Sequence, residues 1–435
     1  MEIGETREGS VLTLRPAGRI DNVTSPVFQQ RLLDAVQTGA ATVVADFSAL
    51  EYISSAGLRA LMMASRRKPE GCRLAVVALN PVVQEIFAIS RFNEVVPVFA
   101  TAAEAIDAPG AAVATAPLRV HFWGTRGSLP CALNHDGVRA KVRDALIAAC
   151  GRGLDTPESV DAFIDRELPF AVRGTFGGNS SCVELAGGDE YVICDLGTGV
   201  REFGNRVIAE HGAGHKHSFN IFLSHLHWDH IMGLPFFVPA YIPGNTIRLY
   251  GCHQMLREML ATQQSQPFFP VDFGSLGATI EFISLEPGRQ YSIGGFAVTA
   301  IKQFHTDDSY GYRFERSGKT VVYSTDCEHK FTALDDSYPF VGFYRNADVL
   351  IFDAMYSLAD SVSIREDWGH SSNIVAVELA QKAGVKRLAL FHHEPTYDDG
   401  MIDAVLGETV RFEELSRDGN RVEVLAAYDG LDLTV

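Results

Sequence analysis

The segment FNIFLSHLHWDHIMGLPFF, residues 219–237, constrains this chain more than any other feature. An apolar run typical of a buried strand leads directly into His225 and His227, which point to the same side of extended chain because they are two residues apart. Asp229 and His230 follow at a turn, ahead of a segment with helical spacing. Three imidazoles and a carboxylate within six residues are costly to bury without a partner, and histidine is the commonest ligand for zinc-like ions. The pattern predicts a metal site at the end of a strand.

This H-x-H-x-D-H pattern resembles the signature of the metallo-β-lactamase superfamily, and further segments match that family in order. VTAIKQFHTDDSYGYRFE supplies His305, TVVYSTDC supplies Asp326, and KRLALFHHEP supplies His392. Each candidate lies where a predicted strand ends, as expected of a site gathered at one rim of a sheet sandwich. The resemblance covers residues 118–435 and implies an α/β fold, the four-layer αββα metallo-β-lactamase sandwich.

The resemblance also implies two divalent ions, each with three ligands of its own and one shared bridge. The first set is His225, His227 and His305. The second set is Asp229, His230 and His392, and the bridge is Asp326. His393 is an open alternative to His392, because a slip of one residue would exchange them. Mixed histidine and carboxylate ligation favours zinc and also permits manganese or iron.

The other histidines lack such a context, and we expect them at the surface. They are His121, His135, His211, His215, His217, His253 and His329. Three of them lie in the run HGAGHKH, residues 211–217, which suggests a second metal tract. Its glycines and lysine favour a solvated loop instead.

The same resemblance narrows the chemistry. The phosphodiesterases, glyoxalases and lactonases of the superfamily carry an aspartate where Asp326 stands, whereas lactamases commonly do not, so antibiotic hydrolysis is not expected. DWGHSSNIVAVELAQKAGVKRLALFHH resembles RNase Z and cyclic-phosphate diesterases, in which a histidine ahead of the helix acts on the leaving group. That histidine is His370 here. The alternative is that His370 and Ser371 only cap a helix at 373–382.

These resemblances predict a metal-dependent phosphodiesterase in which two ions lower the pKa of a shared water to about 7. Asp229 would orient that water, and His370 would protonate the departing oxygen. The expected substrate is a small phosphodiester: a cyclic nucleotide, a short oligonucleotide or a cyclic phosphate. Long nucleic acid is disfavoured, because the formal net charge is −17 and no basic arm that would grip tRNA is found. The alternatives are a lactone or thioester hydrolase, and a signalling protein whose metal domain is a sensor.

The first 107 residues have a different pattern. Strand-like runs at 11–14 and 17–20, expected to pair, precede alternating helical and strand-like segments. Helices are expected at 26–36, 55–67 and 81–90, and strands at 41–47, 73–79 and 95–99. Such alternation predicts a small α/β domain.

Within that domain, TVVADF, SALEY and ISSAGLRALMMASRR resemble the STAS domain of anti-sigma factor antagonists, whose phosphorylated serine begins the helix. Ser55 is then the candidate phosphoacceptor, since a helix N-terminus stabilises an added phosphate. The implied partners are a serine kinase or an anti-sigma factor. Many family members have an aspartate where this chain has Ser54, and the alternative is that both serines are only helix caps.

The run APGAAVATAP, residues 108–117, carries no charge and predicts a linker between a domain at 1–107 and another at 118–435. The seven cysteines form no C-x-x-C pair, which is typical of a reduced protein. With no signal peptide pattern and no apolar run long enough to cross a bilayer, we expect a soluble cytoplasmic protein.

Two features of the larger domain have more than one interpretation. Residues 131–172 form an insertion that could be a lid or a homodimer contact. Four residues in Gly-rich turns at strand ends either border the substrate pocket or build loops. They are Thr125, Arg126, Asn179 and Ser180.

Overall fold

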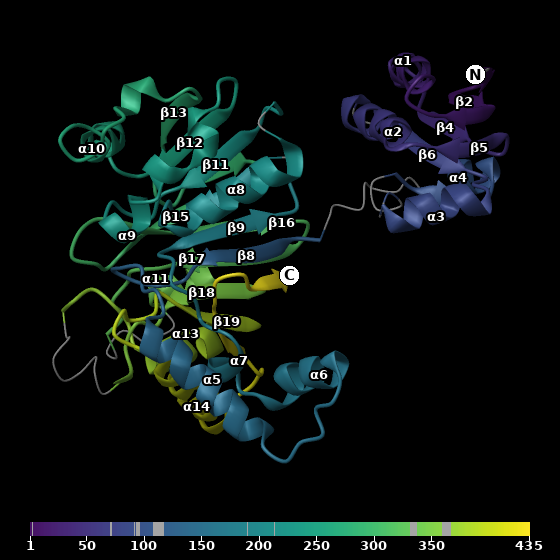
Figure 1. Ribbon diagram of the computed structural model, residues 1–435. Coiled ribbons are helices and arrows are strands. Elements are labelled where there is room, and N and C mark those ends of the chain that lie inside the picture. The colour runs from purple at the N-terminus through teal and green to yellow at the C-terminus, as the bar shows by residue number, and fades with distance from the viewer. Residues whose placement is uncertain are drawn as a thin grey trace. The chain divides into compact units, whose positions relative to one another are not determined.

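The computed structural model divides into two compact units, Met1–Ala114 and Thr115–Val435 (Figure 1). The structure describes residues 1, 3–69, 72–90, 92, 96–107, 117–188, 190–212, 214–330, 337–358 and 367–435. The linker expected at 108–117 therefore lies outside the described residues except for its last position.

The smaller unit is built on a five-stranded sheet with a two-stranded sheet beside it. The first has the order β1 (Ile3–Glu8), β2 (Val11–Pro16), β4 (Thr42–Asp46), β6 (Arg73–Val77) and β7 (Val98–Phe99), and the second pairs β3 (Gly18–Ile20) with β5 (Leu50–Ile53). The helices are α1 (Ser25–Val36), α2 (Ser55–Arg67), α3 (Pro81–Ile89) and α4 (Ala102–Asp107). Val43 packs in the core with α1, α2 and α3, whereas Val44 packs with Ala105 of α4. Helices therefore cover both faces of the five-stranded sheet, as expected for a strand buried on both sides.

The predicted pairing of 11–14 with 17–20 is wrong. β2 pairs with β1 on one side and with β4 on the other, while β3 pairs with β5. Only Ala17 separates β2 from β3, one residue fewer than the two-residue loop of the commonest hairpins. β1 was not predicted, because five of its six residues are exposed and its sequence, IGETRE, lacks an apolar run.

The larger unit contains two seven-stranded sheets. The first has the order β13 (Thr279–Ser284), β12 (Thr246–Gly251), β11 (Ser218–Phe222), β10 (Tyr191–Cys194), β9 (Cys182–Ala186), β8 (Arg119–Gly124) and β21 (Asp432–Thr434). The second has the order β14 (Gln290–Ile293), β15 (Phe296–Gln303), β16 (Ser309–Arg316), β17 (Lys319–Ser324), β18 (Val349–Asp353), β19 (Arg387–Phe391) and β20 (Glu423–Ala426).

Apolar side chains from both sheets, including Phe222 and Tyr312, fill the space between them. On the outer face of the first sheet, α8 (Gly199–His211) buries Val200 and Phe203. On the outer face of the second, α11 (Pro339–Tyr344) and α13 (Asn373–Ala383) pack with α14 (Asp399–Ser416) beside them (Figure 1). The predicted αββα sandwich is confirmed.

Strand direction decides where the functional loops meet. β10, β11 and β12 are mutually parallel in the first sheet. In the second, β17, β18 and β19 are parallel, and β15 runs the same way because two antiparallel pairings separate it from β17. Parallel strands bring their carboxyl ends to the same edge of a sheet, so the loops after these strands are neighbours within each sheet.

The insertion at 131–172 forms α5 (His135–Ala149), α6 (Pro157–Glu167) and the start of α7 (Phe170–Arg173). α7 contacts both α5 and α14, and Lys141 of α5 forms an ion pair with Asp399 at the start of α14 (2.7 Å). The insertion therefore extends the outer helical layer. Among the described residues, no helix has the length and apolarity to cross a membrane. All seven cysteines are described, and none is in a disulfide.

Candidate metal centre

The predicted ligands come from segments that leave strands at one rim of the sandwich. His225 and His227 follow β11, and Asp229 and His230 belong to the short α9 (Trp228–Ile231). In the second sheet the ligands follow three different strands: His305 after β15, Asp326 after β17 and His392 after β19.

These side chains form two overlapping sets, and within each set the donor atoms all lie within 4.8 Å of one another. The first set is His225, His227, His305 and Asp326, and the second is Asp229, His230, Asp326 and His392. In the first, His305 Nε2 lies 3.2 Å from His227 Nδ1. In the second, His392 Nε2 lies 3.3 Å from His230 Nε2 and 3.0 Å from Asp229 Oδ2.

Asp326 lies between the two sets and offers one oxygen to each. Its Oδ2 faces His225 Nε2 at 3.5 Å and His305 Nε2 at 3.8 Å. Its Oδ1 faces His230 Nε2 at 3.2 Å and His392 Nε2 at 3.3 Å. Among the described residues, the buried His225 Nε2 has no hydrogen-bond partner. Buried nitrogens aimed at one another and at a shared carboxylate fit two divalent cations, with Asp326 as the bridge.

The electrostatics keep the carboxylates anionic. Burial disfavours ionisation of Asp326, but His392 and His230 more than offset it and hold its pKa well below the usual range. Burial likewise opposes ionisation of Asp229, and His230 outweighs it, so that this pKa is also well lowered. Burial, followed by the repulsion of His230, lowers the pKa of His225 well below its ordinary value. Burial lowers the pKa of His230, but Asp229 and Asp326 outweigh it and raise that pKa well above its ordinary value. An anionic carboxylate and a neutral imidazole are the forms that bind metal, so a metal ion bound by His230 would displace its proton.

Asp195, which the sequence did not single out, orients the second set. It directly follows β10 and is fully buried. Its Oδ2 accepts hydrogen bonds from His230 Nδ1 and from the Tyr323 hydroxyl, both at 2.7 Å, while Ser224 donates to both of its oxygens. A carboxylate on the far nitrogen of a ligating histidine fixes the ring and its tautomer. A lone aspartate after a strand carries no motif that could have identified it.

Three of these residues share a left-handed backbone conformation. The φ angle is 62° at Asp195, 41° at Asp326 and 61° at His392, each just beyond the end of a buried strand. Residues other than glycine rarely adopt positive φ and do so mainly at functional sites. In each case the turn directs a donor atom into the rim.

His370 stands beside the two sets and is paired with Asp353, a second residue that the sequence did not identify. His370 Nδ1 donates to Asp353 Oδ2 at 2.9 Å, and Asp353 also accepts from the backbone N–H of Cys327 and Met355. Burial opposes protonation of His370, but Asp353 outweighs it and raises the pKa of His370 to about 9. The capping alternative is wrong for this residue, because the Ser372 hydroxyl caps α13 by accepting from Val375 N–H.

His392 and His393 point in different directions. His392 faces the second set, whereas His393 Nε2 donates to the Ala427 carbonyl at 2.8 Å on the other side of the loop. Gly127 lies against the His392 ring so closely that an added Cβ would come within 2.5 Å of Nδ1. The next residue, Ser128, donates its backbone N–H to Asp229 Oδ2 at 2.8 Å.

The sequence left two roles for four residues in Gly-rich turns: bordering the substrate pocket or building loops. In the structure, all four make hydrogen bonds that hold loops together. The Thr125 hydroxyl donates to the Phe176 carbonyl, and the buried Arg126 donates to the carbonyls of Gly177 and Tyr397. The other two, Asn179 and Ser180, both bond to Thr198. It is instead Ser128, from the same TRGS turn, that contacts a candidate ligand.

Large aromatic side chains flank the ligands. Trp228, Phe304 and Trp368 are 74%, 57% and 57% exposed, and each lies within two residues of a metal-ligand candidate or of His370. A cavity of about 780 Å³ opens beside His305 and is lined in part by Phe304 and Gly369. The mouth of the site therefore combines charged groups with exposed aromatic rings.

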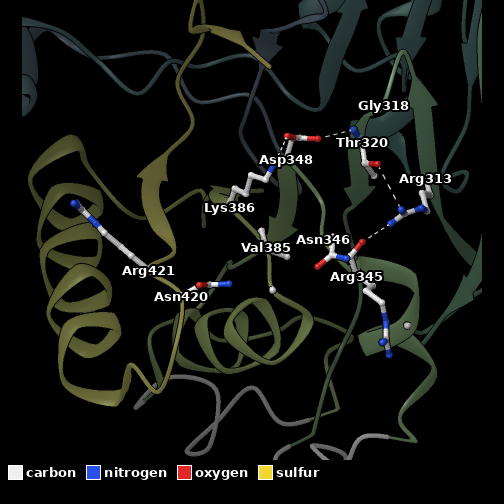
Figure 2. A pocket seen from close by; sticks show the side chains of 12 residues that line it. Arg313, Gly318, Thr320, Arg345, Asn346, Asp348, Val385, Lys386, Asn420 and Arg421 are labelled. Carbon is white, nitrogen blue, oxygen red and sulfur yellow. Dashed lines mark hydrogen bonds and ion pairs between the residues drawn. The ribbon is translucent and has the colours of Figure 1, made fainter.

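A second cavity, of about 830 Å³, lies where the parallel strands of the second sheet begin, at the edge away from the ligands (Figure 2). Its polar groups are already bonded to one another: Asp348 accepts from Lys386 Nζ (2.7 Å) and Thr320 N–H (2.8 Å). Figure 2 shows the Arg345 and Arg421 side chains pointing away from each other. None of the described residues that line this cavity belongs to the two ligand sets.

Of the seven histidines expected at the surface, His329 is buried, and three are half-buried: His121, His217 and His253. His329 is 3% exposed, with its ring packed on Phe340 and Phe352 and its nitrogens facing the Tyr338 and Tyr344 hydroxyls. His121 is partly buried against Trp123. Phe352, which is distant in the chain, helps to create the environment of His329, whereas His121 packs on Trp123 two residues later. A single histidine in the sequence does not reveal such burial.

The two serines of the smaller unit differ in role. Ser54 is the N-cap of α2, and its Oγ accepts from Gly57 N–H at 3.4 Å. Ser55 is the first residue of the helix and is exposed. Ser54 thus supplies the cap, and Ser55 faces solvent at a helix N-terminus.

Comparisons with known families match both units. Residues 191–393 match the family described as a beta-lactamase superfamily domain, and residues 3–97 match the family described as Mlab, STAS domain.

Individual relatives are more distant. A ribonuclease Z of Picrophilus torridus is 26% identical over 230 residues, which are 41% of this chain and 70% of that protein. The metallo-beta-lactamase fold protein YhfI from Bacillus subtilis aligns with 73% of this chain and 99% of its own at 18% identity and a TM-score of 0.49. An anti-sigma factor antagonist from Mycobacterium paratuberculosis aligns with 25% of this chain and 92% of its own at 24% identity and a TM-score of 0.24.

Proposed function

The chain joins an N-terminal STAS domain to a C-terminal hydrolase domain of the metallo-β-lactamase superfamily, and we propose that this hydrolase is a two-metal phosphodiesterase. The pairing of His370 with Asp353 beside the double ligand set carries the proposal. A lactone or thioester hydrolase of this fold has no need of a histidine at that position. Departure of an alkoxide from phosphorus, in contrast, benefits from a positioned acid.

The metal-binding residues would be the two sets joined by Asp326, with zinc as the expected ion and manganese or iron as substitutes. When bound, two such ions supply an activated water at neutral pH and neutralise charge on the phosphoryl oxygens. Asp229, whose Oδ2 is fixed by the Ser128 N–H, would orient the nucleophile. His370, with Nδ1 bonded to Asp353, would hold its proton on Nε2 and donate it to the departing oxygen.

A small phosphodiester is the substrate class that the mouth of the site favours. Exposed aromatic rings such as Trp228 and Phe304 suit stacking of an unpaired base, and the adjacent cavity of about 780 Å³ has room for a nucleotide. The net charge of −17 disfavours long nucleic acid, whose binding rests on clusters of lysine and arginine. Cyclic nucleotides, short oligonucleotides and cyclic phosphates remain the candidates.

We further propose that the STAS domain regulates this activity through phosphorylation of Ser55 by a serine kinase or through an anti-sigma factor. The exposed position of Ser55 on the first turn of α2 supports this role, because a helix N-terminus stabilises the added phosphate. Incubation with a candidate kinase, followed by mass spectrometry of the peptide that holds Ser54 and Ser55, tests it. Phosphate on neither serine would refute it.

The central experiment replaces His370 by Ala and measures turnover of cyclic nucleotides, whose leaving group is an alkoxide that benefits from protonation. We expect kcat to fall by about 10²–10⁴-fold, the usual contribution of a general acid, with unchanged metal content. His135→Ala, at an exposed histidine of α5, is the matched control and should keep full activity. A fully active His370→Ala enzyme would refute the role of His370 as the acid, and a metal-loaded wild type that turns over no phosphodiester would refute the phosphodiesterase proposal. A wild-type protein that holds less than one transition-metal ion and stays inactive after addition of zinc or manganese would refute the metal mechanism.

A further inference from the structure

We propose that His211, His215 and His217 form an accessory site for one divalent transition-metal ion, separate from the catalytic ligands. Sequence context alone favoured a solvated loop for this run. The structure instead gathers its three imidazole rings at one place, where α8 ends and β11 begins.

The local backbone explains why the rings meet. α8 ends at His211, and Gly212, with a φ of 75°, reverses the chain direction. The N–H of His215 donates to the Gly212 carbonyl at 3.3 Å, which holds His215 near the end of α8. His217 then directly precedes β11 and is held by ring contacts with Tyr191 (5.6 Å) and Phe219 (5.9 Å). His217 is thus a fixed anchor near which the other two rings lie.

The ring separations are compatible with one bound ion once the side chains turn, because the donor atoms of this trio do not yet converge within 4.8 Å as those of the catalytic sets do. With a zinc–nitrogen distance of about 2.1 Å, an imidazole centroid lies about 3.2 Å from the ion, and tetrahedral geometry then separates two centroids by about 5 Å. The three observed separations are 5.6 Å (His211 to His215), 5.1 Å (His211 to His217) and 4.5 Å (His215 to His217). In the catalytic trio His225, His227 and His305 they are 4.5, 4.9 and 5.0 Å.

The surroundings also favour a cation. His211 and His215 are exposed, so their side chains can rotate until three nitrogens face one ion. Glu210 Oε2 lies 3.8 Å from His211 Nε2, while its Oε1 faces Arg206 Nε at 3.7 Å, so this carboxylate is shared between the cluster and an arginine. Lys216, the only lysine of residues 211–217, is directed away and donates to the Pro243 carbonyl. Imidazole ligands suit zinc, copper and nickel ions.

The proposed site lies far from the catalytic ligands. It lies at the end of α8, whose 13 residues span roughly 20 Å, while the first residue of α8 is two positions after Gly197 at the catalytic rim. A bound ion would tie the end of α8 to the start of β11, the strand that leads to His225 and His227. We therefore expect it to raise the unfolding temperature of this unit and to leave turnover unchanged.

The test compares metal content in the untagged full-length protein and in the His211→Gln/His215→Gln variant, both dialysed to equilibrium against micromolar Zn²⁺. Both substitutions lie at exposed positions, and circular dichroism without metal confirms that the variant is folded. We expect the variant to bind one ion fewer per chain, with the same phosphodiesterase activity as the wild type. The readout is a difference between two proteins, so it is independent of what the catalytic ligands bind.

The control is His135→Gln, which removes an exposed histidine outside the cluster. It should bind as many ions as the wild type. Equal metal content in wild type and double variant would overturn the proposal. So would an equal loss in the control, because binding would then be a property of any exposed histidine.

Discussion

The burial of His329 should make the stability of the hydrolase unit depend on pH in a way that a single substitution removes. This ring is fully enclosed by aromatic side chains, and the Tyr338 hydroxyl (2.7 Å) and the Tyr344 hydroxyl (3.1 Å) are its polar partners. Burial lowers the pKa of His329 from 6.5 to about 3. Among the described residues, none of the groups that hydrogen-bond to this ring is a carboxylate that could stabilise the imidazolium.

The direction and size of the change in unfolding free energy with pH follow from the difference between the folded-state and unfolded-state pKa of His329. A histidine whose folded-state pKa is lowered contributes stability above pH 6.5, and that stability is lost as the pH falls towards 3. The loss is about 1.4 kcal/mol per pH unit in this window, and therefore about 2 kcal/mol at pH 5. Glutamine at this position stays neutral, so His329→Gln carries no such penalty. Its own cost at neutral pH, from lost packing and altered hydrogen bonds, is about 1–3 kcal/mol.

The assay is urea unfolding at several pH values, followed by tryptophan fluorescence. All three tryptophans, Trp123, Trp228 and Trp368, lie in the larger unit, so the signal reports that unit alone. We expect the variant to be less stable than the wild type at pH 7.5 and the difference to shrink by about 2 kcal/mol at pH 5. His135→Gln is the control, for which the difference should stay constant. A His329→Gln difference that is the same at both pH values would refute the reasoning.

Three further predictions concern single contacts. Ser54→Ala should lower the stability of the STAS domain by about 1 kcal/mol in thermal unfolding, whereas Ser55→Ala should have a much smaller effect, because only Ser54 caps α2; equal losses would contradict this. Asp195→Asn should weaken zinc affinity by about 10–100-fold in a competition with a chelator, because it removes the carboxylate behind His230; unchanged affinity would argue against that role. Gly127→Ala should reduce both metal content and turnover, since the added Cβ has no room beside the His392 ring; a fully loaded, active variant would show that the ring can shift.

Sequence patterns identified the candidate ligands that directly follow a strand or belong to a recognisable motif. The H-x-H-x-D-H segment and the residues after three apolar strands could be found because parallel strands end at a common edge. Their role as ligands stays a prediction, although their donor atoms converge. Asp195 and Asp353 escaped notice because each is a single aspartate at a strand end: Asp195 directly follows β10, and Asp353 is the last residue of β18. Each matters because of a histidine that is distant in the chain, 35 residues from Asp195 and 17 residues from Asp353.

Two features of the structure were not predicted, because they depend on contacts that neighbouring residues in the sequence do not determine. β2 and β3 were expected to pair because they are neighbours in sequence, but the single residue between them cannot form the turn. The gathering of the three rings at residues 211–217 depends on where α8 stops and β11 starts, which the Gly-rich composition did not specify.

The left-handed backbone at Asp195, Asp326 and His392 means that the hydrolase unit stores conformational energy at its rim. Each such residue costs on the order of 1–2 kcal/mol relative to ordinary geometry. Hydrogen bonds around Asp195, and the ions expected between the other two, oppose this cost. Withdrawal of the ions should therefore leave the rim as the part of the unit that opens first, and hydrogen exchange should accelerate there before the sheets between the helical layers respond.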